Sequence, residues 1–329
     1  MGRTPDFETL VARHRREIQV HCYRMLGSLS DAEDLAQETF LRAWKARDGF
    51  EGRASARTWL YRIATNACLD VLARRPRRVL PDQLGPAGEP NGPIAAADLP
   101  WLEPYPDRLL DGAGPDDAVV DRETIELAYL AALQHLPPRQ RAALVLRDVL
   151  GWPAKETAAA LETSVASANS ALQRARTTLR ERLPAHRAEW TAGDPTAEEA
   201  ALLKRFIAAY ENGDPAAVAR LLREDAQAIM PPYTLWFDNR ASIIRALSLS
   251  MDPASPHCVG RFRMRPVRAN RRPAVATYLR RPGEDGFRWF GVSVLTVEDG
   301  LITAMAAFES VPAAAWDLPE TWPGEHASW

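Results

Sequence analysis

The polar side chains of residues 165–183 have the types and spacing that contact with a nucleic acid requires. The segment reads VASANSALQRARTTLRERL, and its apolar residues recur at alternating steps of three and four, as on one face of an α-helix. The opposite face is short and polar at its start and basic further on. Short polar groups at a helix start can approach base edges closely, whereas longer arginines reach the phosphates. The candidate DNA-contacting residues are Ser164, Ser167, Asn169, Ser170, Gln173, Arg174 and Arg176. A solvated helix face is the alternative interpretation of this pattern.

The residues before this helix predict a short helix and a tight turn. Residues 153–161 have the pattern of one short helix, residues 162–163 form the turn, and Thr163 or Ser164 is the expected N-cap of the longer helix. A helix, a brief turn and a longer helix with a polar and basic face make up the helix-turn-helix pattern.

The charge of the chain alternates along its length. The chain has 329 residues and a formal net charge of −2. Residues 1–78 carry a net charge of +5, residues 79–121 carry −8, and residues 122–187 carry +4. Basic segments suit polyanionic partners, so two basic modules joined by an acidic stretch are expected to make different contacts.

Several classes of protein are disfavoured by composition. No apolar run approaches the roughly 20 residues of a membrane helix, and the start of the sequence lacks an apolar signal-peptide core. Both observations favour a cytoplasmic protein with no membrane partner. Cys22, Cys68 and Cys258 lie far apart with no CxxC pair, so we expect neither a disulfide framework nor a metal site.

The first basic module is helical in pattern. A capping box at residues 30–33 predicts a helix that starts at Ser30 and continues through DAEDLAQETFLRAWK. The glycine-bearing loop DGFEGRAS follows. The next segment, RTWLYRIATNACLDVLARR, has a second helical stripe of apolar residues.

Residues 79–118 are rich in proline, glycine and acidic residues, which predicts an extended linker. The phrase WLEPYPDRLL within it is too apolar for a mere spacer, and it suggests that the linker docks on another part of the chain.

From about Pro195 the pattern predicts an α+β domain. Two helices are separated at residues 212–214, and alternating segments then read as strands, with a hairpin turn at residues 299–300. A tail containing Trp316, Trp322 and Trp329 ends the sequence.

The order of these segments resembles a known family. DAEDLAQETFLRAWK, RTWLYRIATNACLDVLARR, the acidic linker and LPPRQRAALVLRDVLGWPAKETAAALETSVASANSALQRARTTLRERL are similar to regions 2 and 4 of bacterial sigma-70 family sigma factors. The extracytoplasmic-function type, which lacks the other regions, is the most similar group. The resemblance covers roughly residues 7–183 and implies a factor that directs core RNA polymerase to specific promoters.

The resemblance implies roles for the residues of each module. Region 2 would bind the clamp helices of the polymerase β′ subunit through Asp31, Asp34, Leu35, Glu38, Thr39 and Arg42. It would read the melted −10 element through Arg53, Arg57, Trp59, Tyr61, Arg62 and Asn66. Trp59 and Tyr61 suit the hydrophobic core equally well. The expected partner, core RNA polymerase, would also be contacted at its β flap. Region 4 would read the −35 element as duplex DNA through the helix-turn-helix. The linker would thread toward the active-site and RNA-exit channels.

Residues 195–310 resemble the cone-shaped SnoaL-like fold, which implies an α+β domain that regulates the sigma factor in cis through contacts with the linker and the sigma regions. The fold usually encloses a pocket. Candidate acid–base residues are Asp238, Arg240, His257 and Glu309. The candidate pocket comprises Tyr233, Trp236, Phe237, Asp238, His257 and Trp289. No spacing demands catalysis, so we expect neither an enzyme nor a cofactor, and a ligand-sensing pocket is a hypothesis.

The expected architecture is therefore multidomain, with two all-α domains joined by an acidic linker and followed by the α+β domain. The boundaries are residues 1–78 for region 2, 79–120 for the linker, 121–187 for region 4, 195–311 for the SnoaL-like domain and 312–329 for the tail. Two alternatives remain: a helix-turn-helix regulator with a ligand-sensing domain, and a cone-fold enzyme with an accessory DNA-binding module.

Overall fold

The computed structural model describes residues 7–50, 55–110, 125–183, 196–309 and 311–323. The chain divides into two compact units that are each built from two segments. The first unit combines Met1–Arg78 with Leu109–Thr191, and the second combines Val79–Arg108 with Ala192–Trp329. The first part of the acidic linker therefore folds with the C-terminal domain.

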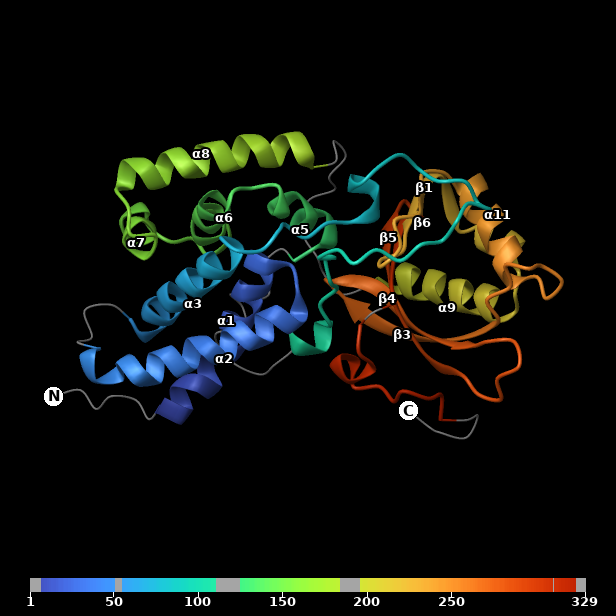
Figure 1. The fold of residues 1–329 in the computed structure, drawn as a ribbon, viewed down its shortest axis with the longest axis horizontal. Coiled ribbons are helices and arrows are strands. Elements are labelled where there is room, and N and C mark those ends of the chain that lie inside the picture. Colours follow the sequence, from blue (N-terminus) through green and yellow to red (C-terminus); the bar gives the residue numbers. More distant parts are fainter. Residues whose placement is uncertain (1–6, 51–54, 111–124, 184–195, 310, 324–329) are drawn as a thin grey trace. The chain divides into compact units, whose positions relative to one another are not determined.

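Two groups of helices form the first unit. They are α1 (Phe7–Leu26), α2 (Leu29–Ala46), α3 (Ala56–Leu72), α5 (Leu127–Gln134), α6 (Pro138–Leu144), α7 (Ala154–Ala160) and α8 (Val165–Arg182). A π-helical turn, η4 (Val145–Val149), follows α6. The helices α1, α2 and α3 pack on one another, and α8 lies across α6 and α7 (Figure 1). Because α3 also contacts α6 and α7, the helical modules that were expected as separate domains pack together.

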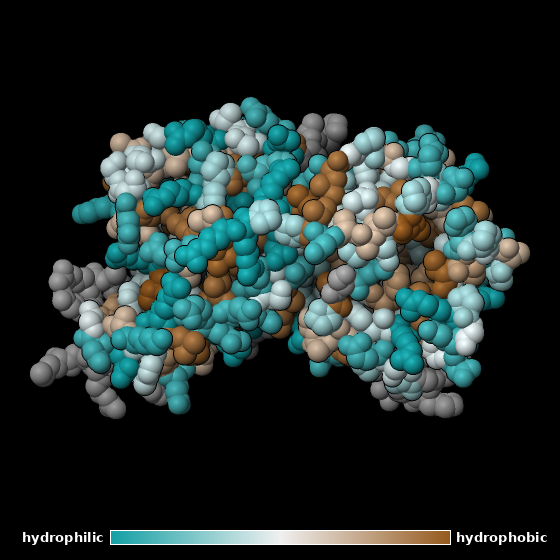
Figure 2. All heavy atoms as spheres, viewed as in Figure 1, coloured by the Kyte–Doolittle hydropathy of each residue, from teal (hydrophilic) through white to brown (hydrophobic). Residues whose placement is uncertain are grey.

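The predicted face of α8 is confirmed. Ala168, Leu172 and Ala175 are buried, and the Ser164 hydroxyl caps the helix by accepting a hydrogen bond from the Ser167 N–H at 3.1 Å. Figure 2 shows mainly hydrophilic side chains over the edge of this unit that α8 forms. The polar face is therefore left in solvent.

The start of α2 differs from its prediction. The N-cap is Ser28, whose hydroxyl accepts a hydrogen bond from the Asp31 N–H, so the helix begins at Leu29 rather than Ser30. Gly27 has a φ of +71° and ends α1, and Ser28 is extended, which gives Ser28 the cap geometry.

The second unit is built on a six-stranded sheet of order β2-β1-β6-β5-β4-β3. The strands are β1 (Leu222–Ile229), β2 (Trp236–Phe237), β3 (Arg261–Ala269), β4 (Arg272–Arg280), β5 (Arg288–Glu298) and β6 (Leu301–Phe308). Among the strands of this sheet, as far as the structure describes them, only β1 and β6 pair in parallel. The predicted fold class, helical modules followed by an α+β domain, is confirmed.

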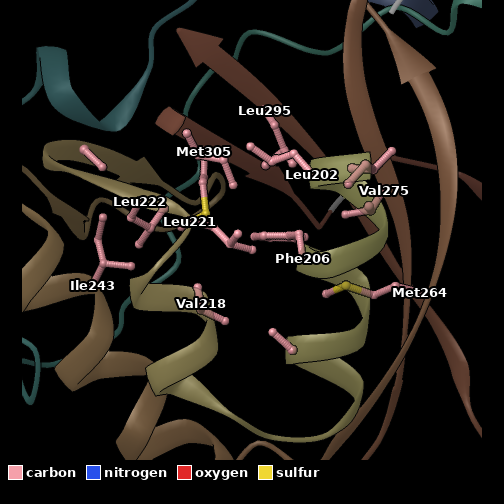
Figure 3. Close-up of a cluster of buried hydrophobic side chains, with 14 residues drawn as sticks. Leu202, Phe206, Val218, Leu221, Leu222, Ile243, Met264, Val275, Leu295 and Met305 are labelled. Atoms are coloured by element: carbon pink, nitrogen blue, oxygen red, sulfur yellow. The ribbon is translucent and has the colours of Figure 1, made fainter. Parts of the chain in front are cut away.

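One face of this sheet, here called the inner face, carries the hydrophobic core of the second unit. The helices of this unit are α9 (Ala197–Glu211), α10 (Pro215–Ala219) and α11 (Arg240–Met251). Figure 3 shows Phe206 pointing from α9 toward Leu221 and Met305. Sequence analysis anticipated α9, α10 and the last four strands, but it missed β1, β2 and α11.

The C-terminal tail packs on the opposite, outer face of the sheet. The rings of Tyr278 and Trp322 meet edge to face at 5.1 Å, and the Tyr278 hydroxyl donates to the Pro319 carbonyl. Trp316, in the short helix η5 (Ala313–Trp316), is also buried. Trp329 lies outside the described residues. The tail is therefore part of the second unit rather than an appendage.

We expect Ser28→Ala to lower the free energy of unfolding by about 1 kcal/mol, because it removes the cap of α2. Ser30→Ala is the matched control and should cost less, since the Ser28 hydroxyl, and not the Ser30 hydroxyl, accepts the capping hydrogen bond from the Asp31 N–H. Urea unfolding followed by circular dichroism measures both. If Ser30→Ala lowered the free energy of unfolding more than Ser28→Ala, Ser30 would be the N-cap and the prediction would be contradicted.

Candidate nucleic-acid interface

The polar face of α8 is largely available for contact. Ser164, Ser167, Asn169, Ser170, Gln173 and Arg174 are all exposed. Arg176 differs, because its guanidinium forms a two-point ion pair with Asp148 at 2.8 and 2.7 Å. Arg176 therefore fixes α8 against η4, and only part of its charge is left for a phosphate.

Two of the residues expected to read DNA on α3 support the fold instead. Tyr61 is completely buried, and its hydroxyl donates to Glu17 Oε2 at 3.2 Å. Arg57 Nε donates to the same oxygen at 2.6 Å, and His14 contacts the other carboxylate oxygen. Because Glu17 is itself buried, these partners compensate its desolvation. Arg57 and Tyr61 hold α3 on α1.

The outward face of α3 retains Trp59, Arg62 and Asn66, none of which is buried. Trp59 stacks on Phe50 with the ring centroids 4.7 Å apart. A stacked aromatic pair that water reaches is suited to contact with an unpaired base. Arg53 lies outside the described residues.

The helix-turn-helix packs on this part of α3. Arg62 Nη2 lies 3.3 Å from Glu162 Oε1 in the turn between α7 and α8, and the Tyr61 ring meets Trp152 edge to face at 5.7 Å. Arg141, which is buried, donates to the Met25 carbonyl at the end of α1. The helix-turn-helix thus partly covers the surface of α3 that was expected to read the −10 element.

Some of the candidate protein-binding residues of α2 are exposed, and others are buried in the fold. Asp34 and Arg42 are exposed, and Glu38 and Leu35 are half-buried. Thr39 is buried and donates to the Leu35 carbonyl at 2.7 Å, so its side chain is not available to a partner.

Asp31 forms an internal ion pair with two arginines that follow α3. Its carboxylate oxygens lie 2.7 Å from Arg75 Nη1 and 2.5 Å from Arg78 Nη2. Burial alone would raise the pKa of Asp31, but the hydrogen bonds and charges of Arg78 and Arg75 outweigh it and lower the pKa. Asp31 therefore ties the segment after α3 to the start of α2.

Two exposed apolar side chains on α2 were missed in the sequence. Leu41 is 55% exposed and Trp44 is 46% exposed, so together they place apolar area on the surface of α2. They lie three positions apart, so they share one face of the helix. Their displacement by one residue from the buried stripe at Phe40 and Ala43 is the signal that could have identified them.

The linker residues Tyr105 and Asp107 are hydrogen-bonded to the turn between β3 and β4. The Tyr105 N–H donates to Asn270 Oδ1, and the Asn270 N–H donates to the Tyr105 carbonyl, both at 2.9 Å. The Arg271 N–H donates to Asp107 Oδ1 at 2.9 Å, and Arg268 Nε lies 3.3 Å from Asp107 Oδ2. Asn270 is fully buried, and Asp107 is 1% exposed.

The rest of this linker segment also contacts the C-terminal domain. Trp236 Nε1 donates to the Gly85 carbonyl at 3.0 Å, and the Ala97 N–H donates to the Pro232 carbonyl at 2.9 Å. Arg108 donates to the carbonyls of two residues in η5. Residues 79–108 are therefore an ordered part of the second unit, whereas residues 111–120 of the predicted linker lie outside the described ones.

The six candidate pocket residues of the second unit do not form one site. Trp289 is on the outer face, where its ring meets Tyr278 at 5.5 Å and its Nε1 donates to the Val311 carbonyl. Asp238 and His257 are exposed. Phe237 packs against the core, and Trp236 bonds to the linker. The structure places Trp289 outside the predicted pocket, because a β-bulge at this point of β5 turns its side chain away from the inner face.

Tyr233 pairs with a carboxyl group that sequence analysis had considered separately. The Tyr233 hydroxyl donates to Glu309 Oε2 at 2.9 Å. Burial raises the pKa of Glu309 to about 7, although the Tyr233 hydrogen bond and the Arg281 charge oppose the shift. Within the described part of the chain, no cluster of acidic, histidine or cysteine side chains could hold a metal ion. None of the described helices has the length and apolar character needed to cross a membrane.

Comparisons with known proteins match the chain in three successive parts. A model of sigma-70 region 2 matches residues 10–78, one of sigma-70 region 4 matches residues 126–179, and one of a SnoaL-like domain matches residues 203–305. The ECF RNA polymerase sigma factor SigG of Mycobacterium tuberculosis is 47% identical over 84% of this chain and 75% of its own length.

A second relative matches nearly the whole chain. The ECF RNA polymerase sigma factor SigJ of Mycobacterium tuberculosis is 28% identical over 91% of this chain and 89% of its own length. The crystal structure of SigJ has a TM-score of 0.60 at 24% identity and covers 95% of this chain and 98% of that one. The same fold therefore extends over both proteins.

The ion pairs of Asp31 lead to a pH-dependent stability. The pKa of Asp31 is lower in the folded state than in the unfolded state. The ion pairs therefore contribute fully to the free energy of unfolding above the unfolded-state pKa of about 3.9, and this contribution is lost as the pH falls through the folded-state pKa. We expect Asp31→Asn to lower the free energy of unfolding by about 1 kcal/mol at pH 6, and this deficit should shrink toward pH 3. Urea unfolding across that range measures it.

Asp34→Asn is the matched control on the same helix, and its effect on the free energy of unfolding should be small because the side chain is exposed. A deficit for Asp31→Asn that stays unchanged down to pH 3 would contradict the role given to the two arginines.

Proposed function

Because the chain belongs to the ECF RNA polymerase sigma factors, we propose that its C-terminal domain controls promoter-directed transcription in cis by holding the linker. The sigma-factor assignment and the SnoaL-like fusion expected from the sequence are both confirmed by the comparisons. The observation that carries the regulatory part is the pair of reciprocal hydrogen bonds between Tyr105 and Asn270.

We infer that α8 reads the −35 element in the major groove of duplex DNA. Ser167, Asn169 and Ser170 lie near the start of the helix, where approach to base edges is closest. Gln173 and Arg174 follow on the same exposed face and suit phosphate contacts, which add affinity but little specificity. Arg176 is assigned a positioning role through Asp148.

The −10 element is assigned to the outward face of α3. Trp59 and Asn66 suit an unstacked base and its polar edge, and Arg62 suits the backbone. The two promoter elements lie about 25 base pairs apart, or roughly 85 Å along B-form DNA. Modules in contact through Arg62 and Glu162 cannot span that distance, so the contact must open when a promoter is bound.

Core polymerase is assigned to the exposed face of α2. Asp34, Glu38 and Arg42 supply charge, and Leu41 and Trp44 add apolar area that suits the centre of a protein interface. In this proposal Asp31 and Thr39 support the helix from inside. Contact with the β flap of core polymerase rests on the family resemblance alone. As a factor that works with polymerase, the protein is expected in the cytoplasm, with no chemistry of its own.

The regulatory proposal follows from where the linker is held. In this family the linker is expected to thread toward the channels of the polymerase, and a linker bound to the C-terminal domain is not free to do so. Asn270 has a φ of +54° and Arg271 has a φ of +58°, so the turn presents both backbone N–H groups to the linker in a fixed geometry. Release of the linker would be coupled to loss of all these bonds.

Promoter recognition is tested by run-off transcription with purified core polymerase. Asn169→Ala should weaken specific promoter binding by about 1–3 kcal/mol and leave nonspecific binding nearly unchanged, because one set of base contacts is lost. Thr177→Ala is the matched control on α8, since its hydroxyl already bonds to the Gln173 carbonyl. The absence of any transcript that depends on both core enzyme and promoter would sink the proposal.

The linker contact is tested by Asn270→Gly, which keeps the positive φ but removes the amide that binds Tyr105. Amide exchange of linker residues 101–108 should accelerate roughly 5- to 150-fold, the equivalent of about 1–3 kcal/mol. Asp299→Gly is the matched control, since Asp299 has a φ of +51° in the hairpin between β5 and β6.

Run-off transcription by the same two variants completes the test. Control in cis requires Asn270→Gly to change transcript yield while Asp299→Gly does not. If exchange accelerates but transcription stays the same, the docking is real and the regulatory claim is wrong.

A further inference from the structure

Arginine is concentrated in and around the hairpin of β3 and β4. Residues 253–283 contain eight arginines and no aspartate or glutamate, although the second unit as a whole contains more acidic than basic residues. β3 is an edge strand, so the hairpin forms the border of the sheet (Figure 1). A local excess of positive charge within an acidic domain indicates a surface for an anionic partner.

Along the middle of β3 and at the turn of the hairpin, carboxylates of the same unit already pair with arginines. Arg268 Nε lies 3.3 Å from the Asp107 carboxylate of the linker, which also accepts a hydrogen bond from the Arg271 N–H. Arg263 Nη1 lies 3.3 Å from Glu211 Oε2 at the end of α9. The charges of Arg263 and Arg268 are therefore balanced within the fold.

Arg261 and Arg280 lie at the open end of the hairpin, directly opposite each other. They are register partners in an antiparallel pair, so their Cβ atoms lie about 4.5–5.5 Å apart on one face of the sheet. Tyr278, two positions from Arg280, packs against the tail, so this is the outer face. Both arginines are exposed, and neither forms an ion pair with any described residue. Like charges in this position destabilise a sheet, and an anion bound between them would offset that cost.

An aromatic ring orients one of these two arginines. The guanidinium carbon of Arg280 lies 5.0 Å from the centre of the Phe287 ring, and that of Arg263 lies 5.7 Å from it. The Trp322 N–H donates to the Phe287 carbonyl at 2.9 Å, so the tail fixes the backbone that carries the ring. Stacking on a ring orients a guanidinium and leaves its charge and its N–H donors available. The open end thus has an oriented cation beside an exposed one.

We propose that the open end of the β3–β4 hairpin binds single-stranded nucleic acid, with Arg261 and Arg280 on its phosphates and a base stacked beside Phe287. The guanidinium fork matches phosphate oxygens, and an aromatic ring among cations suits an unpaired base better than a duplex or an acidic peptide. This surface belongs to neither α3 nor α8 nor the linker contact. The inference therefore stands whether or not the C-terminal domain controls transcription.

The test uses the full chain and a fluorescein-labelled oligothymidylate of about 12 nucleotides, which forms no duplex. The parent protein carries Arg62→Gln and Arg174→Gln, which weaken the two DNA-binding surfaces proposed for the first unit. Fluorescence anisotropy should show saturable binding to this parent. Adding Arg261→Gln and Arg280→Gln should weaken binding about 10- to 30-fold at about 0.1 M salt, and it should reduce the slope of log K against log salt by about 1.4, because two phosphate contacts are lost.

Arg205→Gln with Arg245→Gln, added to the same parent, is the matched control. Both arginines are exposed on helices of the same unit, so the change in net charge is identical. Affinity should stay nearly constant, because salt screens charges that do not touch the strand. Thermal unfolding should give both variants a melting temperature close to that of the parent, since none of the replaced side chains is buried.

Three results would overturn the proposal. The first is the absence of saturable oligothymidylate binding by the parent. The second is equal weakening by the two pairs of substitutions, because only net charge would then matter. The third is displacement of the oligonucleotide by polyglutamate at equal charge, since the surface would then suit an acidic protein equally well.

Discussion

The second unit depends on a carboxylate that is almost completely removed from water. Asp107 comes from the linker, and a buried carboxylate persists only while it is paired and hydrogen-bonded. Its partners, the Arg271 N–H and the Arg268 guanidinium, belong to the hairpin between β3 and β4. The linker and the hairpin therefore fix each other. Partial detachment would leave a charge or an amide without a partner, which favours release in one step over gradual fraying.

A buried carboxylate also constrains the surfaces of the first unit that we propose to bind DNA. Glu17 is buried between helices and occupies Arg57 and Tyr61, which by type alone resemble DNA-contacting residues. Asp148 also pairs with Arg176, although Asp148 is exposed. The arginines that remain in solvent, such as Arg174, are the ones whose charge a phosphate can use. Internal pairing thus separates the residues that shape the surface from those that can bind.

Local patterns predicted much of this structure. Neighbouring residues are enough to predict the apolar period of α8, its cap at Ser164 and the strands from β3 to β6. Local motifs also identified the family. The start of α2 was wrong because serine stands at both position 28 and position 30, and only the backbone at Gly27 decides between them. β1 was missed because LREDAQAI buries only Leu222 and Ala226 and exposes charged residues between them.

The candidate sites were harder to predict because they depend on contacts between distant parts of the sequence. Nothing near Tyr61 indicates that its partner is Glu17, and nothing near Tyr105 points to Asn270. Strict alternation along β5 would place the Trp289 side chain on the same face as Gly291, toward the core. The bulge at Phe290 adds one residue, so Trp289 lies on the outer face instead. A single extra residue in a strand thus redirects a predicted pocket wall to the tail.

The discontinuous second unit limits how such proteins can be recombined. Residues 79–108 are separated in sequence from the domain with which they fold, and most of the second helical module lies between them. A chimera that exchanged only residues 192–329 with another sigma factor would leave Tyr105 and Asp107 opposite a foreign hairpin. Exchange of both segments together keeps each buried donor with its acceptor, so the linker and the appended domain form a single heritable module.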